Sequence, residues 1–150
     1  MQIIDAQVHL WGSGLPSNMS HWQVTSFTPE EAIKLMDEGG VHGAVIHPPS
    51  WDPGSKEMAS AAVRNYPGRF AIMGRASVHQ AESEALFDTW KDQPGMLGLR
   101  YTFHTPEQRR WLAERTVDWL WAAAEKNGLH IMMLPPGQLD KVAGICERHP

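Results

Sequence analysis

Short apolar segments alternate with segments of helical periodicity along the whole chain, and this alternation most constrains the fold. The expected strands are residues 3–10, 41–47, 69–75, 96–103 and 129–134. The expected helices are residues 28–38, 55–65, about 81–92, 105–127 and about 138–148. Strand and helix follow one another with short connections and without a hairpin signal, so the sequence predicts a parallel sheet with helices on its outer face.

Two of the expected helices begin with the same local signal. Thr28-Pro29-Glu30-Glu31 and Thr105-Pro106-Glu107-Gln108 each supply an N-cap threonine, a proline at the first helical position and an acceptor at the third. The pairs Gly39-Gly40 and Asn127-Gly128 are typical of helix ends. The helix boundaries are therefore predicted from chemistry as well as from periodicity.

The parallel sheet could be an open doubly wound sheet or a barrel. A doubly wound sheet normally has a glycine-rich phosphate loop after its first strand, but no helix begins directly after Leu10-Trp11-Gly12-Ser13-Gly14-Leu15. We therefore predict an α/β fold of the (β/α)8 TIM-barrel type. A closed barrel usually needs about 250 residues, so residues 1–150 are expected to form a partial barrel of about five β/α units.

Five strands cannot close a barrel, because the first and last strands would each keep an unpaired edge. The C-terminal strands of the barrel are absent from the 150 residues. We therefore expect either a longer chain or a homo-oligomer in which a partner copy supplies the missing part.

Composition excludes several classes of function. The net charge is −4 with no basic block, which argues against nucleic acid as a partner. Apolar runs such as residues 131–136 are too short to cross a bilayer, and residues 1–5 lack a signal-peptide pattern. A single cysteine, Cys146, excludes an internal disulfide framework. These features predict a cytoplasmic protein that binds a small-molecule substrate and neither nucleic acid nor membrane.

Barrel active sites lie at the carboxyl ends of the strands, and this rule sorts the histidines. His9 and His47 close the first and second expected strands, and His104 follows the fourth, so all three belong to the active face. His42 and His130 open their strands and belong to the opposite face.

The first expected strand carries the main candidate site. By strict alternation Asp5, Gln7 and His9 share one face, which points into the interior of a barrel. An imidazole there can ligate a metal or transfer a proton, or it can simply bond to a polar neighbour. The spacing by itself leaves both interpretations open.

The segment Ile4-Asp5-Ala6-Gln7-Val8-His9-Leu10-Trp11 resembles the amidohydrolase-2 branch of the amidohydrolase superfamily, whose first strand usually carries Asp-x-His-x-His. Gly98-Leu99-Arg100-Tyr101 is similar to the Gly-x-Arg segment of the family's lactonases, and Phe70-Ala71-Ile72-Met73-Gly74-Arg75 fits the third strand. The resemblance extends over the whole chain. It implies a divalent metal, most commonly zinc, with His9 as a ligand.

Two departures weaken the implied metal site. Gln7 replaces the first histidine of the pair, and a carboxamide oxygen is a poorer zinc ligand than imidazole. Residues 132–136 offer no histidine after the fifth strand. Some members of this branch open lactones without a required metal, whereas others decarboxylate aromatic or dienoic acids on zinc.

Further residues complete the expected site. Arg100 is a candidate to bind a substrate carboxylate, with a permanent salt bridge to a carboxylate such as Asp5 as the alternative. His47 is expected to orient substrate or move a proton. The remaining substrate-binding candidates are Gln7, Trp11, Trp51 and His104.

The leading hypothesis is an amidohydrolase-like hydrolase that opens a small carboxylated lactone or related cyclic ester by water attack. A zinc-dependent decarboxylase is the alternative enzyme. The alternative outside enzymes is a non-catalytic binding protein derived from a barrel, which the replacement by Gln7 permits.

Overall fold

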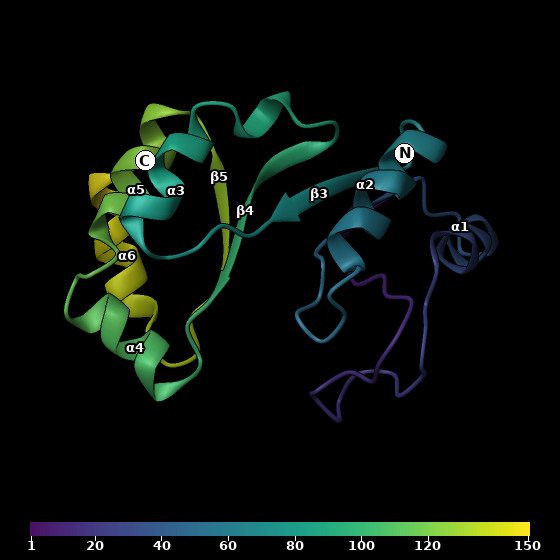
Figure 1. Ribbon diagram of the computed structural model, residues 1–150, viewed down its shortest axis with the longest axis horizontal. Coiled ribbons are helices and arrows are strands. Elements are labelled where there is room, and N and C mark those ends of the chain that lie inside the picture. The colour runs from purple at the N-terminus through teal and green to yellow at the C-terminus, as the bar shows by residue number, and fades with distance from the viewer. The chain divides into compact units, whose positions relative to one another are not determined.

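The computed structural model describes the backbone of residues 1–150 and the side chains of residues 1–79 and 82–150. The chain forms two compact units (Figure 1). The first unit comprises residues 1–74 and 94–96, and the second comprises residues 75–93 and 97–150. All five expected strands and the helices between them are present.

The first unit holds three parallel strands in the order β1-β2-β3. Its elements are β1 (Ile4–Val8), α1 (Pro29–Glu38), β2 (Gly43–Ile46), α2 (Ser55–Asn65) and β3 (Phe70–Gly74). Its core joins the strand residues Ala44, Ile46 and Ile72 to small residues of the two helices. Leu10, just after β1, is fully buried in the same core. The alternate residues of these strands therefore face away from the helices.

A bulge interrupts β1, and it changes one prediction. Asp5 is in register with Ala44 and Val8 with Ile46, so β1 advances three residues while β2 advances two. Because neighbours in register point to the same face, Asp5 falls on the face of Val8 and not on that of His9. The prediction that Asp5 shares a face with His9 is therefore wrong, since strict alternation holds only in an unbroken strand.

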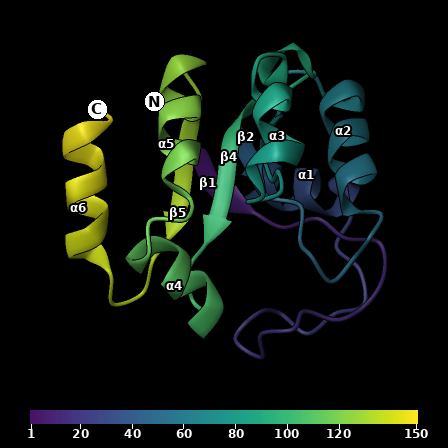
Figure 2. The ribbon, with the colours of Figure 1, turned by 60° about the vertical axis from the view of Figure 1, so that its left-hand side comes forward.

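The second unit is built on the parallel pair β4 (Met96–Thr102) and β5 (His130–Leu134). Its helical elements are α3 (Gln80–Phe87), the short 3-10 helix η1 (Trp90–Asp92), α4 (Pro106–Ala113), α5 (Asp118–Lys126) and α6 (Leu139–Arg148). Helix α5 lies alongside β5 (Figure 2). On that side Phe103, just after β4, contacts Trp121 of α5 with ring centroids 6.2 Å apart.

Gly98 allows the two strands of the second unit to approach closely. A Cβ atom at this position would lie 2.1 Å from the carbonyl oxygen of His130. No side chain fits at that distance without moving the β5 backbone. The glycine of the Gly-x-Arg segment is therefore explained by the pairing of β4 with β5.

The capping signals are confirmed, whereas two helix predictions are corrected. Thr28 and Thr105 both form complete capping boxes, with Glu31 and Gln108 respectively. The single helix predicted over 105–127 is instead α4 and α5, separated by a turn in which Arg115 adopts a φ of 59°. The helix predicted over 81–92 likewise divides into α3 and η1. Among the described residues, no helix is long and apolar enough to cross a membrane.

Candidate active site

Two histidines lie together at the carboxyl ends of β1 and β2, as the sequence predicts. His9 directly follows the end of β1, and His47 follows β2. The Nδ1 atom of His9 lies 2.7 Å from the carbonyl oxygen of His47, and the two ring centroids are 5.3 Å apart. Strands β1 and β2 run parallel, so these imidazoles share one edge of the sheet in the first unit.

The hydrogen bond determines which nitrogen of His9 is basic. A carbonyl oxygen only accepts hydrogen bonds, so the Nδ1 atom of His9 carries the hydrogen. In the neutral ring, Nε2 is then the nitrogen that can accept a proton. The Nδ1 atom of His47 lies 3.3 Å from the carbonyl oxygen of Met73, and the same reasoning applies to it.

His21 joins this pair, although the sequence did not identify it as a site residue. Its ring centroid lies 5.3 Å from that of His9 and 5.8 Å from that of Trp51. It belongs to the irregular segment between β1 and α1, where no periodicity indicates which residues face the site. The number of histidines in the chain is the only signal that could have drawn attention to it.

Trp51 contacts two of these imidazole rings, those of His9 and His21, and Trp11 supports it. Trp51 packs edge-on against His9, with centroids 5.4 Å apart, and against Trp11, with centroids 5.7 Å apart. Trp11 is buried, and its indole Nε1 donates to the carbonyl oxygen of Val24. Trp11 therefore lies behind Trp51 in the core. We define the imidazole cluster as His9, His21, His47 and Trp51.

Asp52 is a second site residue that the sequence did not indicate. Its side chain is buried, and it accepts hydrogen bonds from the backbone N–H groups of Gly12 and Gly54 and from the hydroxyl of Ser13. The Gly12 bond is the main reason why the pKa of Asp52 lies below its ordinary value; burial acts in the opposite direction.

Of the two predicted metal ligands, His9 lies in the imidazole cluster, whereas Gln7 lies elsewhere on β1. Gln7 lies in the β1 bulge with an exposed side chain, and its backbone N–H donates to the carboxylate of Asp5. Among the side chains that the structure describes, no group of three His, Cys, Asp or Glu residues is placed to hold a metal ion. Gln7, which is exposed in the bulge, therefore does not join His9 in a group of this kind within the described part of the chain.

Arg100 lies on β4 in the second unit and is a buried residue. Its neighbours Leu99 and Tyr101 are buried, and Tyr101 packs on Phe103 towards α5, so Arg100 lies on the face away from the helix. Its Nη1 donates to the carbonyl oxygen of Tyr101 at 2.5 Å. Within the described part of the chain, its Nε has no hydrogen-bond partner. Burial, and secondarily the positive charge of Arg75, lowers the pKa of Arg100.

Two further side chains lie near the end of β4. Burial raises the pKa of Tyr101 to about 12, although the backbone N–H of Ala76 and the charge of Arg75 oppose the shift. His104 is exposed, and its backbone N–H donates to the side-chain oxygen of Gln108. His104 thus belongs to the start of α4.

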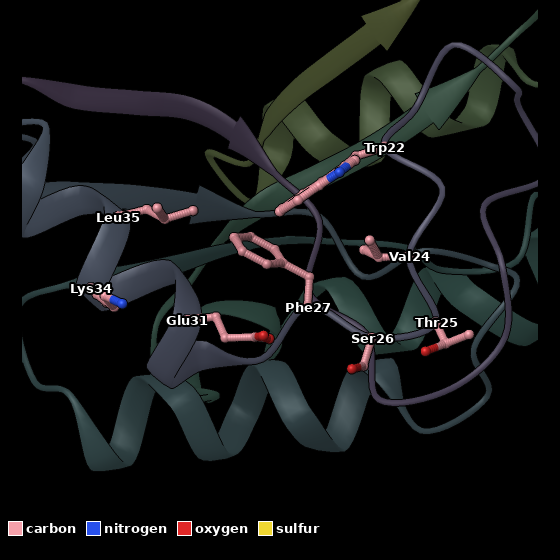
Figure 3. Close-up of a pocket in the computed structure, with 8 residues that line it drawn as sticks. All are labelled: Trp22, Val24, Thr25, Ser26, Phe27, Glu31, Lys34 and Leu35. Carbon is pink, nitrogen blue, oxygen red and sulfur yellow. The ribbon is translucent and has the colours of Figure 1, made fainter.

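A separate pocket of about 470 Å³ lies between α1 and the segment that leads into it (Figure 3). Trp22, Phe27 and Leu35 point into it, with Glu31 and Lys34 at its border. The carboxylate of Glu31 is engaged with Thr28 in the capping box. The side chains that point into the pocket are therefore mainly apolar. It holds none of the predicted site residues.

Known structures share this fold. An amidohydrolase from Burkholderia multivorans with bound zinc matches with a TM-score of 0.73 and 17% identity, over 99% of this chain and 55% of that protein. A probable 2-pyrone-4,6-dicarboxylic acid hydrolase from Acinetobacter baumannii with citric acid bound matches with a TM-score of 0.66 and 18% identity, over the same shares of the two chains. No family model and no curated protein matches the sequence.

These likenesses confirm the predicted fold class. The chain has the fold of part of a (β/α) barrel with about five β/α units, and it spans about half the length of the structures that it matches. The resemblance to the amidohydrolase superfamily is confirmed at the level of the fold.

Proposed function

We propose that this chain provides the first catalytic groups of a hydrolase that opens a small carboxylated lactone or a related cyclic ester. The observation that carries the proposal is the imidazole cluster. Two strand ends and two loops bring the rings of His21, His47 and Trp51 into contact with the ring of His9. Such a site can transfer protons, because imidazole is the side chain that most often serves as general acid or base.

The geometry of His9 supports a role as general base. Its Nδ1–H donates to the backbone of His47, which holds the ring in one tautomer. Nε2 then takes a proton from water as the water oxygen attacks the ester carbonyl. The carbonyl electron pair moves to oxygen and returns when the ring C–O bond breaks. The departing alkoxide recovers the proton from the His9 imidazolium, which restores the neutral imidazole.

Arg100 supports the substrate class. A buried guanidinium with an unpartnered Nε among the described residues favours a ligand that brings its own negative charge. A carboxylate can accept two hydrogen bonds from one guanidinium. The structure from Acinetobacter baumannii holds citric acid, which is itself a carboxylated molecule. Both matched proteins are named as hydrolases or amidohydrolases, which favours hydrolysis over decarboxylation.

A panel of carboxylated lactones tests the proposal, with hydrolysis followed by acid release. We expect the wild-type protein to exceed the background rate and His9→Ala to lose at least about 100-fold, the range that general-base catalysis contributes. His79→Ala is the matched control, since His79 is exposed and makes no side-chain cap bond.

Equal rates for wild type, His9→Ala and buffer would overturn the hydrolase and favour a binding protein. Turnover of an aromatic acid that requires stoichiometric zinc would instead favour the decarboxylase.

A further inference from the structure

Asp52 connects two loops that are far apart in the sequence. Its Oδ2 accepts the Gly12 N–H at 2.7 Å, and its Oδ1 accepts the Gly54 N–H at 2.9 Å and the Ser13 hydroxyl at 3.2 Å. Gly12 and Ser13 begin the loop that follows β1, whereas Gly54 caps α2. One buried carboxylate therefore ties the β1 loop to the start of α2.

The loop that follows β1 also packs closely against Trp51 and against Met58 of α2. A Cβ atom at Gly12 would lie 2.9 Å from the Met58 side chain, and one at Gly14 would lie 3.3 Å from the carbonyl oxygen of Trp51. Gly14 also has a φ of 84°, which other residues rarely adopt. The carboxylate of Asp52 accepts the N–H groups of both Gly12 and Gly54, and these bonds hold the two loops together.

The residues beside these anchor points form the imidazole cluster. Trp51 directly precedes Asp52 and contacts the rings of both His9 and His21. His21 lies further along the loop that Gly12 and Ser13 begin. Movement of either loop would therefore change the packing of Trp51 on the two imidazoles.

We propose that Asp52 is a positioning residue that holds Trp51 and the His21 loop against His9. It acts through the two loops and does not itself need to touch substrate. Its importance for catalysis rests on the proposed function, whereas its effect on the arrangement of the rings does not.

Histidine ring resonances of the whole 150-residue chain test the positioning directly. The indole of Trp51 shifts the ring protons of His9 and His21, and two-dimensional NMR with His→Gln variants assigns them. We expect Asp52→Asn to remove most of this shift, because an amide replaces one acceptor oxygen with a donor that faces Gly12 or Gly54.

Two variants keep the test decisive. Asp37→Asn is the matched control, since Asp37 is an exposed carboxylate of the same unit bonded to Arg69, and it should leave the ring resonances unchanged. Ser13→Ala removes one of the three hydrogen bonds and should shift the His21 and Trp51 resonances in the same direction by a smaller amount. Unchanged rings in a folded Asp52→Asn protein overturn the proposal. If that variant does not fold, unchanged rings in Ser13→Ala overturn it.

A kinetic measurement separates this proposal from the proposed function. With an active lactone, Asp52→Asn should lower kcat by up to about 100-fold, the loss that a displacement of about 1 Å can cause, with little change in KM. The conservative Asp52→Glu variant should recover part of the loss. If the wild-type protein hydrolyses nothing, the hydrolase is wrong, but the ring resonances still decide the role of Asp52. An unchanged kcat in Asp52→Asn overturns the positioning role.

Discussion

The two units each bury a charged side chain, and the two charges are treated differently. In the first unit, Asp52 accepts three hydrogen bonds, and its pKa is lowered. In the second, Arg100 donates to one backbone carbonyl, has an unpartnered Nε among the described residues, and also has a lowered pKa. A lowered pKa means a stabilised charge for the carboxylate and a destabilised charge for the guanidinium.

This difference separates a charge that stabilises the fold from one that the proposed function assigns to a substrate carboxylate. The hydrogen bonds of Asp52 outweigh its cost of burial, so the folded chain gains from its charge. The folded chain gains little from the charge of Arg100, because burial and Arg75 both oppose it. A buried charge that does not stabilise the protein is a candidate for binding.

The largest expected effect on stability follows from replacing Asp52. Replacement by alanine should lower the free energy of unfolding by about 3 kcal/mol, because the three hydrogen bonds that the Asp52 carboxylate accepts are lost, at about 1 kcal/mol each. Urea denaturation followed by tryptophan fluorescence measures the change. A loss below about 1 kcal/mol would contradict the view that this carboxylate ties the loops together.

The next effect is the pH dependence of the same interaction. The pKa of Asp52 is lower in the folded chain than in the unfolded chain. Its contribution is therefore complete above the unfolded pKa of about 4 and is lost as pH falls through the folded value. The difference in unfolding free energy between wild type and Asp52→Asn should shrink over this acidic range. A difference that stays constant down to the lowest measurable pH would show that the charge contributes nothing.

The smallest expected effect on stability is that of Arg100→Met. Methionine fills similar space without a charge, so the free energy of unfolding should rise, or change by less than about 1 kcal/mol. Under the proposed function, the same variant should raise KM for a carboxylated lactone at least about tenfold.

Leu99→Ala is the control on the same strand. Leu99 is fully buried, and its truncation should cost about 3 kcal/mol. A comparable loss in Arg100→Met would remove the contrast between the two charges, because Arg100 would then support the fold as Asp52 does.

Most of the fold could be predicted from the sequence because its signals are local. The capping boxes of Thr28 and Thr105 each join residues three positions apart, and both are present in the structure. The positions of His9 and His47 followed from the ends of two predicted parallel strands. The turn at Arg115 was not predicted, because the helical periodicity continues through residues that do not form helix.

Less of the candidate site could be predicted. The bulge in β1 displaced Asp5 from the face of His9, and no residue pattern marked the extra position. His21 and Asp52 lie in irregular loops, where a side chain's neighbours are not related to its position by any period. Their partners could be found only once the loops were placed in space.

The order of strands and helices, the helix caps and the histidines at two strand ends were determined by the sequence itself, since each depends on interactions within a few residues. The tertiary structure decided which loop residues meet. Asp52 and Gly12 are 40 positions apart, and His9 and His47 are 38 apart. Contacts at such separations form only when the intervening strand and helix pack, because packing offsets the entropy lost on closing the loop.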